Sequence, residues 1–240
     1  MNAETDQPWR LDGRIVLVTG AGDGLGRATA IALAQAGATV IATSKRRRRL
    51  EALDDTIRAE GKTVTLLPLD LAELEQIQPI GPSIYQRFGR LDAVIHCAAV
   101  MGKLMPTAQL DVDTLRQTIT VDALATQALI ATLDPLLQAA PDARAFFLTD
   151  RLAQRGKPFL AAYTAAKQAM EALVLAYAAE TRQSNLVVRL VAPPPLATKL
   201  RKTAYPGEPE AEQLATDLAA GRLLALLTAP VLPEGEVIDL

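Results

Sequence analysis

The chain has 240 residues, of which 50% are hydrophobic, and a net charge of −2, so it can form one large core but has no strong field to recruit nucleic acid or an anionic membrane. Its single cysteine cannot form an internal disulfide, and the first ten residues lack the basic and apolar segments of a secretory leader. No run of 18 apolar residues is present, so we expect a cytoplasmic protein with a single domain over residues 1–240 that neither crosses a membrane nor binds nucleic acid.

A glycine-rich turn joins the first predicted strand, 15–18, to the first predicted helix, 27–35. The backbone N–H groups that open such a helix face an anion. Gly20 would allow the tight turn, Gly24 would let a pyrophosphate approach the backbone, and Gly26 would let helix and strand pack closely. The sequence therefore predicts a dinucleotide site here, with these candidate residues: Gly20, Gly22, Asp23, Gly24, Leu25 and Gly26.

The second predicted strand, 39–43, is followed by Ser44, Lys45 and Arg46. In this architecture the strand ends beside the adenosine ribose, where an acidic residue would bind the 2′-hydroxyl of NAD and a cation would suit a 2′-phosphate. We therefore expect NADP as the cofactor, with NAD less favoured. The outer residues of the basic run 45–49 are expected to face water, and the lack of interleaved aromatic residues argues against a nucleic-acid patch.

The third predicted strand, 63–69, ends in Asp70 and Leu71, which we expect beside the nucleotide. The Asp70 carboxylate could accept a hydrogen bond from the adenine amino group or cap the next helix. That next segment, 73–88, has helical spacing but contains two prolines and a glycine, so its helix should be kinked or broken.

The fourth predicted strand, 91–95, leads into a short segment that should border the nucleotide through Cys97, Ala98 and Ala99. We expect His96 to be structural, with the adenosine or ribose side of the nucleotide as its alternative neighbour. Cys97 is expected to be a small packed residue rather than a nucleophile, because nothing nearby in the sequence would lower its pKa.

The remaining elements continue the alternation of strands and helices. A long helix with Leu115, Ile119 and Leu129 on one side precedes a strand at 145–149, and a strand at 237–238 ends the chain. Alternation without repeats or flexible linkers predicts an α/β fold, a Rossmann-like doubly wound parallel sheet with helices on both faces. The cofactor should lie at the carboxyl edge of the strands.

Tyr163 and Lys167 stand four residues apart near the start of the most apolar predicted helix, 162–179. This spacing places the phenol and the ammonium on one face, where the positive charge favours the phenolate. Because a free tyrosine titrates near ~10, a lowered pKa would make Tyr163 a general acid or base near neutral pH. The pair therefore predicts proton transfer at this end of the helix.

The glycine turn, Asp70 with Leu71, the Tyr163 and Lys167 pair, and a proline-led segment after the sixth strand together resemble the short-chain dehydrogenase/reductase family over nearly the whole chain. Segment 198–206 is similar to a bacterial branch of uncharacterised oxidoreductases. The resemblance implies hydride transfer between C4 of a nicotinamide and a carbonyl or alcohol carbon. It also implies that Tyr163 exchanges the proton and that Lys167 hydrogen-bonds the nicotinamide ribose.

Two expected catalytic positions depart from the family's pattern. The family has a serine hydroxyl donor where this chain has Asp150, and an ionised aspartate donates nothing and would raise the pKa of Tyr163. Either Asp150 stays protonated and donates through its own O–H, or Thr149 supplies the hydroxyl. The family's helix asparagine, which supports a water relay to the lysine, aligns with Asp122, which accepts a hydrogen bond but has no amide to donate.

After the sixth predicted strand, 186–191, the family's Pro-Gly is replaced by Pro193, Pro194 and Pro195. The resemblance implies that this loop meets the nicotinamide carboxamide, so we expect Pro193 at the cofactor, although a second proline removes a donor N–H. The polar stretch 196–213 is either a substrate lid or an inert surface excursion.

The sequence predicts an NADP-dependent oxidoreductase that acts on a small carbonyl or alcohol and holds no metal. The alternative is a catalytically impaired nucleotide-binding protein of the same fold that acts as a sensor or subunit. Helix 162–179 is apolar on all sides, so the face turned away from the sheet needs cover. A homodimer or homotetramer would supply that cover.

Overall fold

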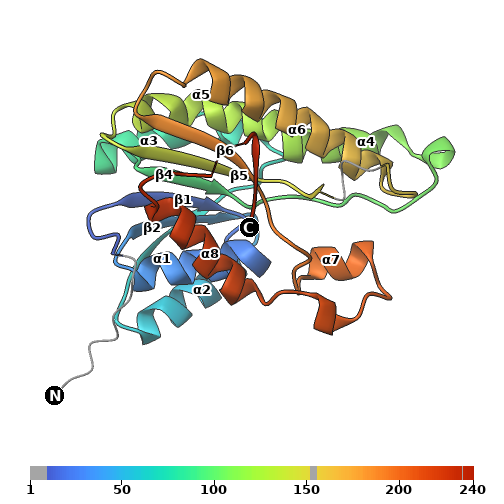
Figure 1. Cartoon of the computed structure of the whole chain (residues 1–240), viewed down its shortest axis with the longest axis horizontal. Helices are drawn as coiled ribbons and strands as arrows, with labels where there is room; N and C mark the ends of the chain where they lie inside the picture. Colours follow the sequence, from blue (N-terminus) through green and yellow to red (C-terminus); the bar gives the residue numbers. More distant parts are fainter. Residues whose placement is uncertain (1–9, 152–155, 234) are drawn as a thin grey trace.

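A parallel β-sheet occupies the centre of the molecule (Figure 1). The computed structural model describes residues 10–151, 156–233 and 235–240. The expectation about a secretory leader concerns positions 1–9, which lie outside these residues. In the described part, seven strands pair in the order β3-β2-β1-β4-β5-β6-β7, and every pairing is parallel. The strands are β1 (Ile15–Thr19), β2 (Thr39–Ser44), β3 (Val64–Pro68), β4 (Ala93–His96), β5 (Ala143–Leu148), β6 (Leu186–Ala192) and β7 (Val237–Asp239).

Helices cover both faces of this sheet (Figure 1). One face carries α1 (Gly24–Gln35), α2 (Arg47–Ala59) and α8 (Thr216–Thr228), and the other carries α3 (Ile80–Phe88), α4 (Val112–Ile119), α5 (Ala125–Gln138) and α6 (Ala161–Glu180). The predicted doubly wound α/β fold is therefore confirmed.

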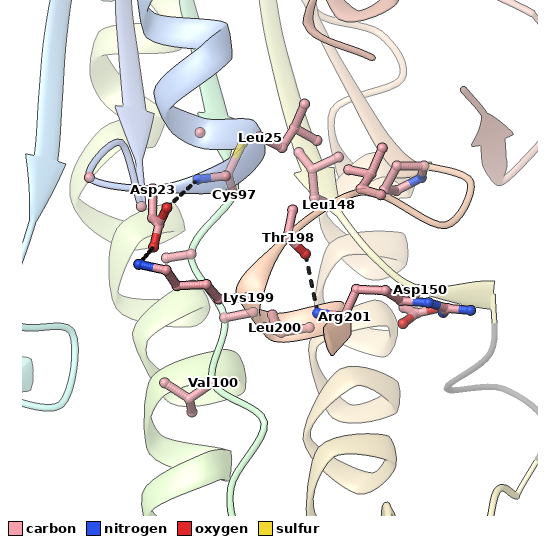
Figure 2. A pocket seen from close by; sticks show the side chains of 18 of the residues that line it. Asp23, Leu25, Cys97, Val100, Leu148, Asp150, Thr198, Lys199, Leu200 and Arg201 are labelled. Carbon is pink, nitrogen blue, oxygen red and sulfur yellow. Dashed lines mark hydrogen bonds and ion pairs between the residues drawn. The ribbon is translucent and has the colours of Figure 1, made fainter. Parts of the chain in front are cut away.

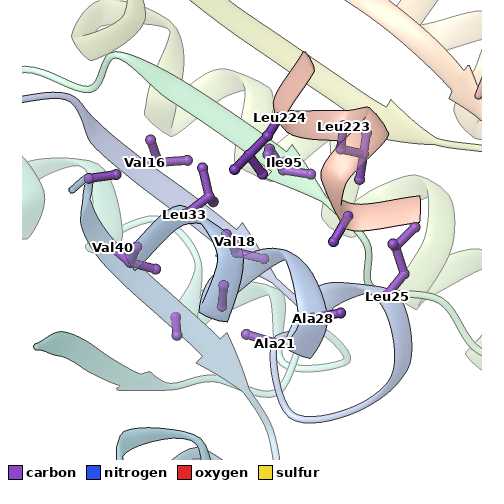
Figure 3. Packing of buried hydrophobic residues seen from close by; sticks show 14 of the residues in the cluster. Val16, Val18, Ala21, Leu25, Ala28, Leu33, Val40, Ile95, Leu223 and Leu224 are labelled. Atoms are coloured by element: carbon purple, nitrogen blue, oxygen red, sulfur yellow. The ribbon is translucent and has the colours of Figure 1, made fainter. Parts of the chain in front are cut away.

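Strand β1 shows why the sequence folds into these layers. All five of its residues are buried, and successive side chains enter opposite layers. Val16 and Val18 pack with α1 and α8 in the cluster of Figure 3, whereas Ile15 and Leu17 pack on the other side. A continuous apolar run is what a central parallel strand requires.

The strand order reverses at β1, which lies between β2 and β4. At such a switch point the crossover helices leave in opposite directions, and a crevice opens beyond the carboxyl ends of the strands. Thr19 and His96 are register partners at this edge of β1 and β4. The fold therefore places the glycine turn, which follows Thr19 directly, at the mouth of the crevice.

Several boundaries differ from the predicted ones for local reasons. Helix α1 begins at Gly24, earlier than predicted, because the Asp23 side chain caps it by accepting a hydrogen bond from Gly24 N. The segment 73–88 is broken, as its prolines indicated, into the 3₁₀ turn η1 (Leu74–Gln76) and α3. The predicted long helix is divided into α4 and α5 by a π-helical turn, η3 (Thr120–Leu124), which the sequence pattern did not predict.

His96 connects the central strands to the π turn. It is fully buried, with Nδ1 2.8 Å from Thr19 Oγ1 and Nε2 3.3 Å from Thr126 Oγ1. Because the Thr126 hydroxyl donates its proton to the Asp122 carbonyl, Nε2 carries the imidazole hydrogen and Nδ1 accepts from Thr19. Burial, with a smaller effect of the Lys167 charge, lowers the pKa of His96 to about 3. The expected structural role is therefore confirmed.

This neutral histidine makes stability depend on pH. An unfolded imidazole binds a proton below about pH 6.5 and the folded one does not, so stability is lost as pH falls from about 6.5 towards 3. Between about pH 7.5 and 5.0 we expect His96 alone to lower the free energy of unfolding by about 2 kcal/mol. Urea titrations at both pH values measure this loss.

The control for this measurement is His96→Gln, because His96 is the only histidine of the chain. The glutamine variant should lose less stability over the same pH interval, whatever its absolute stability. Equal losses in the two proteins would show that His96 is not held neutral by the fold.

Candidate active site

One cavity of about 780 Å³ runs along the carboxyl edge of the sheet, a size typical of cofactor sites. Its walls come from the glycine turn, the ends of β2 and β5, the segment after β4, the start of α6 and the loop after β6. The cavity brings together all of the predicted site residues except Asp122: Gly20, Gly22, Asp23, Gly24, Leu25, Gly26, Ser44, Lys45, Arg46, Asp70, Leu71, Cys97, Ala98, Ala99, Asp150, Tyr163, Lys167 and Pro193.

Two positions of the glycine turn, Gly20 and Gly26, have no room for a side chain. Gly20 has φ +68°, and a Cβ there would lie 2.8 Å from Ala98 Cα, while a Cβ on Gly26 would lie 2.5 Å from the Gly20 carbonyl oxygen. The backbone therefore folds tightly against the segment after β4 and against the start of α1, and this helix N-terminus lines the cavity. This cradle fits the pyrophosphate of a dinucleotide.

Asp23 caps α1 at this turn and holds two cations. Its carboxylate accepts from Gly24 N at 3.0 Å, forms an ion pair with Arg49, and lies 3.6 Å from Lys199 Nζ (Figure 2). Burial alone would raise the pKa of Asp23, but the Gly24 hydrogen bond and the charges of Arg49 and Lys199 hold it below its ordinary value. The carboxylate therefore remains charged beside the anion cradle.

Sequence reasoning missed Arg49, which it left among the outer residues of the basic run. Arg49 lies in the first turn of α2, lines the cavity and contacts the glycine turn, whereas Arg48 is exposed and lies outside the cavity wall. Helical spacing could have indicated Arg49, because it stands about one helical turn after Arg46, the N-cap of α2. The predicted Arg46 also lines the cavity, with an exposed side chain.

Asp70 lines the cavity and also closes its own turn. Its Oδ1 accepts a hydrogen bond from Ala72 N at 3.0 Å, but the next helical turn, η1, has Glu73 as its N-cap and no side-chain cap, so the predicted capping use is wrong. The contact with adenine stays a prediction. Nearby, burial raises the pKa of the Cys97 thiol to about 12, so a thiolate is not available and the residue is packed, as expected.

At the other end of the cavity, α6 presents Tyr163 in its first turn and Lys167 one turn later. The Tyr163 hydroxyl lies 3.5 Å from Asp150 Oδ2. Lys167 is 3% exposed, and its Nζ donates to the Leu148 carbonyl at 3.2 Å and lies 5.9 Å from the centroid of the Tyr163 ring. The phenol and ammonium thus share one helix face, as their spacing predicted.

The expected lowering of the Tyr163 pKa by Lys167 is wrong for this arrangement. Burial, followed by the charges of Asp150 and Asp122, raises the pKa of Tyr163 well above its ordinary value. The ammonium of Lys167 contacts the Leu148 carbonyl and Asp122, and its charge does not outweigh the burial and the carboxylates that raise the pKa of Tyr163. Tyr163 is therefore a protonated acid at neutral pH.

Asp122 does not line the cavity, but it lies beside Lys167, the residue that the predicted relay would reach, and its catalytic role stays a prediction. It lies buried in the π turn, where Oδ1 accepts from Val100 N at 3.0 Å and Oδ2 lies 3.9 Å from Lys167 Nζ. Burial raises the pKa of Asp122 to about 6 against the opposing effects of Lys167 and Val100. Asp122 therefore lies next to the Lys167 ammonium on the side away from the cavity.

The two predicted substitutes for the family serine differ in the structure. The Thr149 hydroxyl donates to Glu171 on α6, so the proposal that Thr149 supplies the missing donor is wrong. Asp150 lies at the cavity wall and contacts the Tyr163 hydroxyl, so an acidic side chain occupies the donor position.

Segment 196–213 closes over this end of the cavity. A bridge between Leu196 and Leu214 joins its base, and α7 (Lys199–Ala204) and η5 (Glu210–Glu212) lie within it. Thr198 caps α7 by accepting from Arg201 N at 3.2 Å (Figure 2), and Leu200 and Arg201 line the cavity. An inert excursion would not supply cavity walls, so this geometry favours the lid interpretation. We call segment 196–213 the lid.

Among residues 10–151, 156–233 and 235–240, no cluster of three or more His, Cys, Asp or Glu side chains could hold a metal ion. Within the same residues, no helix combines the length and the apolar character needed to cross a membrane.

Comparisons with known proteins agree with this geometry. The family model described as short chain dehydrogenase matches residues 14–209. An uncharacterized oxidoreductase of Escherichia coli K12, YciK, is 32% identical over 201 residues, which cover 82% of this chain and 79% of the relative.

Two similar solved structures contain nucleotide. A candidate short chain dehydrogenase from Escherichia coli CFT073, complexed with NADPH, has a TM-score of 0.90 and 29% identity, and the match covers 95% of this chain and 97% of that one. A counterpart from Shigella flexneri, complexed with NADP, has a TM-score of 0.89 and 28% identity, with 95% and 97% of the two chains covered.

Proposed function

The chain belongs to the short-chain dehydrogenase family of oxidoreductases, and from this premise we propose that it is an NADP-dependent enzyme of a small carbonyl or alcohol substrate. The observation that carries the proposal is that one cavity joins the glycine cradle to Tyr163 and Lys167. When bound there, the nicotinamide would supply a hydride at C4. The protein's own groups then bind, orient and exchange the proton.

The two ends of the cavity would divide these tasks. The glycine turn would bind the pyrophosphate through backbone N–H groups, and the cations at the start of α2 would bind a 2′-phosphate. Lys167 would hydrogen-bond the nicotinamide ribose, and Pro193 would border the nicotinamide. The NADP and NADPH complexes of two similar proteins support the choice of NADP.

Tyr163 would deliver the proton to a substrate oxygen during reduction. Its raised pKa keeps the phenol protonated at neutral pH, which suits the acid role in carbonyl reduction better than the base role in alcohol oxidation. Positive charge from Lys167 would stabilise the phenolate that forms when the proton leaves.

The cofactor preference can be tested with neighbouring arginines. Arg49→Ala should weaken NADPH binding about tenfold or more and change NADH binding little, because only NADPH presents a phosphate to this guanidinium. Arg46→Ala should act in the same direction, and the exposed Arg48→Ala is the control that should leave both nucleotides unaffected. Fluorescence titration measures the affinities of the natural protein and of the three variants for NADPH and for NADH. Equal losses for NADPH and NADH in Arg49→Ala would remove that residue from phosphate recognition.

The proton-transfer role predicts separable effects on binding and turnover. Tyr163→Phe should lower kcat for carbonyl reduction by about 10²–10⁴ while NADPH affinity stays within about threefold, because the phenyl ring keeps the packing and loses only the acid. The rate of NADPH oxidation with a panel of carbonyl compounds measures kcat, and fluorescence titration measures the NADPH affinity. Unchanged kcat in the variant would exclude Tyr163 as the acid.

A second candidate function is nucleotide binding without turnover, as a sensor or subunit. The Asp150 carboxylate favours it, because it lies where the family has a hydroxyl donor and raises the pKa of Tyr163. If the natural protein binds NADPH without oxidising it and Asp150→Ser restores turnover, the second candidate is correct. Turnover by the natural protein supports the first.

We also propose that the protein is cytoplasmic and forms a homodimer or homotetramer through α6. Ala165, Ala172 and Ala176 are exposed on its outward face, and Leu124 on the neighbouring π turn is 46% exposed. Small and apolar residues on one exposed face favour close helix contact with a second copy.

This oligomer has a direct test. Ala172→Arg should shift the protein to the monomer mass in light scattering, because a long charged side chain would be buried at the contact. Ala52→Arg, on exposed α2 across the sheet, is the matched control and should keep the natural mass. If both variants keep it, α6 is not the contact surface.

A further inference from the structure

The lid contributes a lysine to the cavity beside the glycine turn. Lys199 is the first residue of α7 and lines the cavity together with this turn. Its Nζ lies 3.6 Å from Asp23 Oδ2 (Figure 2), and its side chain is 78% exposed. Exposed ion pairs contribute little to stability, so the stability of the fold alone does not account for a cation at this position. An anion bound in the cavity would account for it.

The lid backbone next to Lys199 is fixed against the glycine turn. A Cβ on Gly24 would lie 3.2 Å from the Thr198 Cγ2 methyl, so the residue before Lys199 packs on the glycine that we expect to admit a pyrophosphate. Thr198 Oγ1 accepts from Arg201 N at 3.2 Å, and Thr198 N donates to the Leu196 carbonyl at 2.7 Å. The long, flexible side chain of Lys199 therefore starts from an ordered backbone position beside the expected phosphates.

The direction from which Lys199 reaches the turn indicates which phosphate it meets. The glycine turn follows β1, and β1 lies between β2 and β6 in the sheet. Arg49 reaches the turn from α2, after β2, where the 2′-phosphate is expected. Lys199 comes instead from the lid, after β6, on the side of Tyr163. The phosphates between these two ends of the cavity are those of the pyrophosphate.

Asp23 holds a negative charge at this point of the structure. Its carboxylate accepts from Gly24 N at 3.0 Å at the start of α1 and pairs with Arg49 as well as with Lys199. A negative group at a helix N-terminus, beside cations, is an arrangement that a phosphate also favours. Bound pyrophosphate would bring further negative charge next to Asp23, and the exposed ammonium of Lys199 is free of steric enclosure and able to turn to it.

We propose that Lys199 is a nucleotide-binding residue whose ammonium turns from Asp23 and donates a hydrogen bond to a pyrophosphate oxygen of the bound dinucleotide. This inference rests on the proposed function. NADPH and NADH carry the same pyrophosphate, so Lys199 strengthens the binding of both, whereas Arg49 distinguishes between them. Because Lys199 belongs to the lid, the same contact holds the lid over the bound nucleotide.

The first test removes the charge of Lys199. Lys199→Gln should weaken NADPH and NADH about tenfold each, the usual effect of losing one hydrogen bond to a charged group. Lys199→Arg keeps the charge and should bind both nucleotides within about threefold of the natural protein. Lys202→Gln is the matched control, because Lys202 is an exposed lysine of the same helix and lies outside the cavity wall. Fluorescence titration of each protein with the two nucleotides measures these affinities.

A second background separates phosphate binding from a purely structural role. Asp23→Asn keeps a side chain that can cap α1 but removes the carboxylate that contacts Lys199. If Lys199 acted only by tying the lid to Asp23, adding Lys199→Gln to this variant would cost no further affinity. A lysine that binds phosphate directly loses a competing partner in Asp23→Asn, so adding Lys199→Gln should then cost about tenfold or more.

The inference is wrong, and the proposed function stands, if Lys199→Gln keeps both affinities or loses no more than Lys202→Gln does. A loss confined to NADPH would also overturn it, because Lys199 would then serve the 2′-phosphate. A loss that disappears in Asp23→Asn would make Lys199 a lid anchor instead. If the natural protein binds neither NADPH nor NADH, the proposed function fails, and the inference fails with it.

Discussion

The buried ammonium of Lys167 is the constraint on which the catalytic end of this protein depends. A charge that is 3% exposed is costly unless protein groups replace its water, and two groups do so, the Leu148 carbonyl at 3.2 Å and Asp122 at 3.9 Å. They come from the end of β5 and from the π turn. Because these elements converge on Lys167, the first turn of α6 is fixed, and with it Tyr163. π-helical turns are frequent at functional sites, and here one supplies the buried counter-charge.

The lid connects this end of the cavity to the nucleotide cradle. Lys199 at the start of α7 lies beside Asp23 in the glycine turn, while Arg201 lies close enough to Asp150 for the two charges to interact. Asp23 also forms an ion pair with Arg49, which is one of the cations that would bind a 2′-phosphate. Arg49 and the lid residue Lys199 therefore contact the same carboxylate. The Lys199–Asp23 ion pair therefore joins the lid to the glycine turn.

The sequence predicted the features that depend on neighbouring residues. The glycine turn could be identified because strand, turn and helix are contiguous, and the Tyr163 and Lys167 pair because four residues make one helical turn. What the sequence could not predict depends on contacts between distant segments. The engagement of Thr149 by Glu171, the pairing of Lys167 with Asp122 and the resulting pKa of Tyr163 all arise from the packing of α6 on β5 and on the π turn. Arg49 was missed although it stands one helical turn after Arg46, because its spacing indicates the shared face and only the packing of α2 turns that face to the cavity.

A crystal structure of the NADPH complex would test the central claim most directly, namely that one cavity holds the nucleotide and brings its reactive end to Tyr163. The account predicts pyrophosphate at the turn between Gly20 and Gly26, the 2′-phosphate on Arg49, and nicotinamide C4 facing the space beside the Tyr163 hydroxyl. A complex with that turn empty, or with the nicotinamide held away from Tyr163, would contradict it.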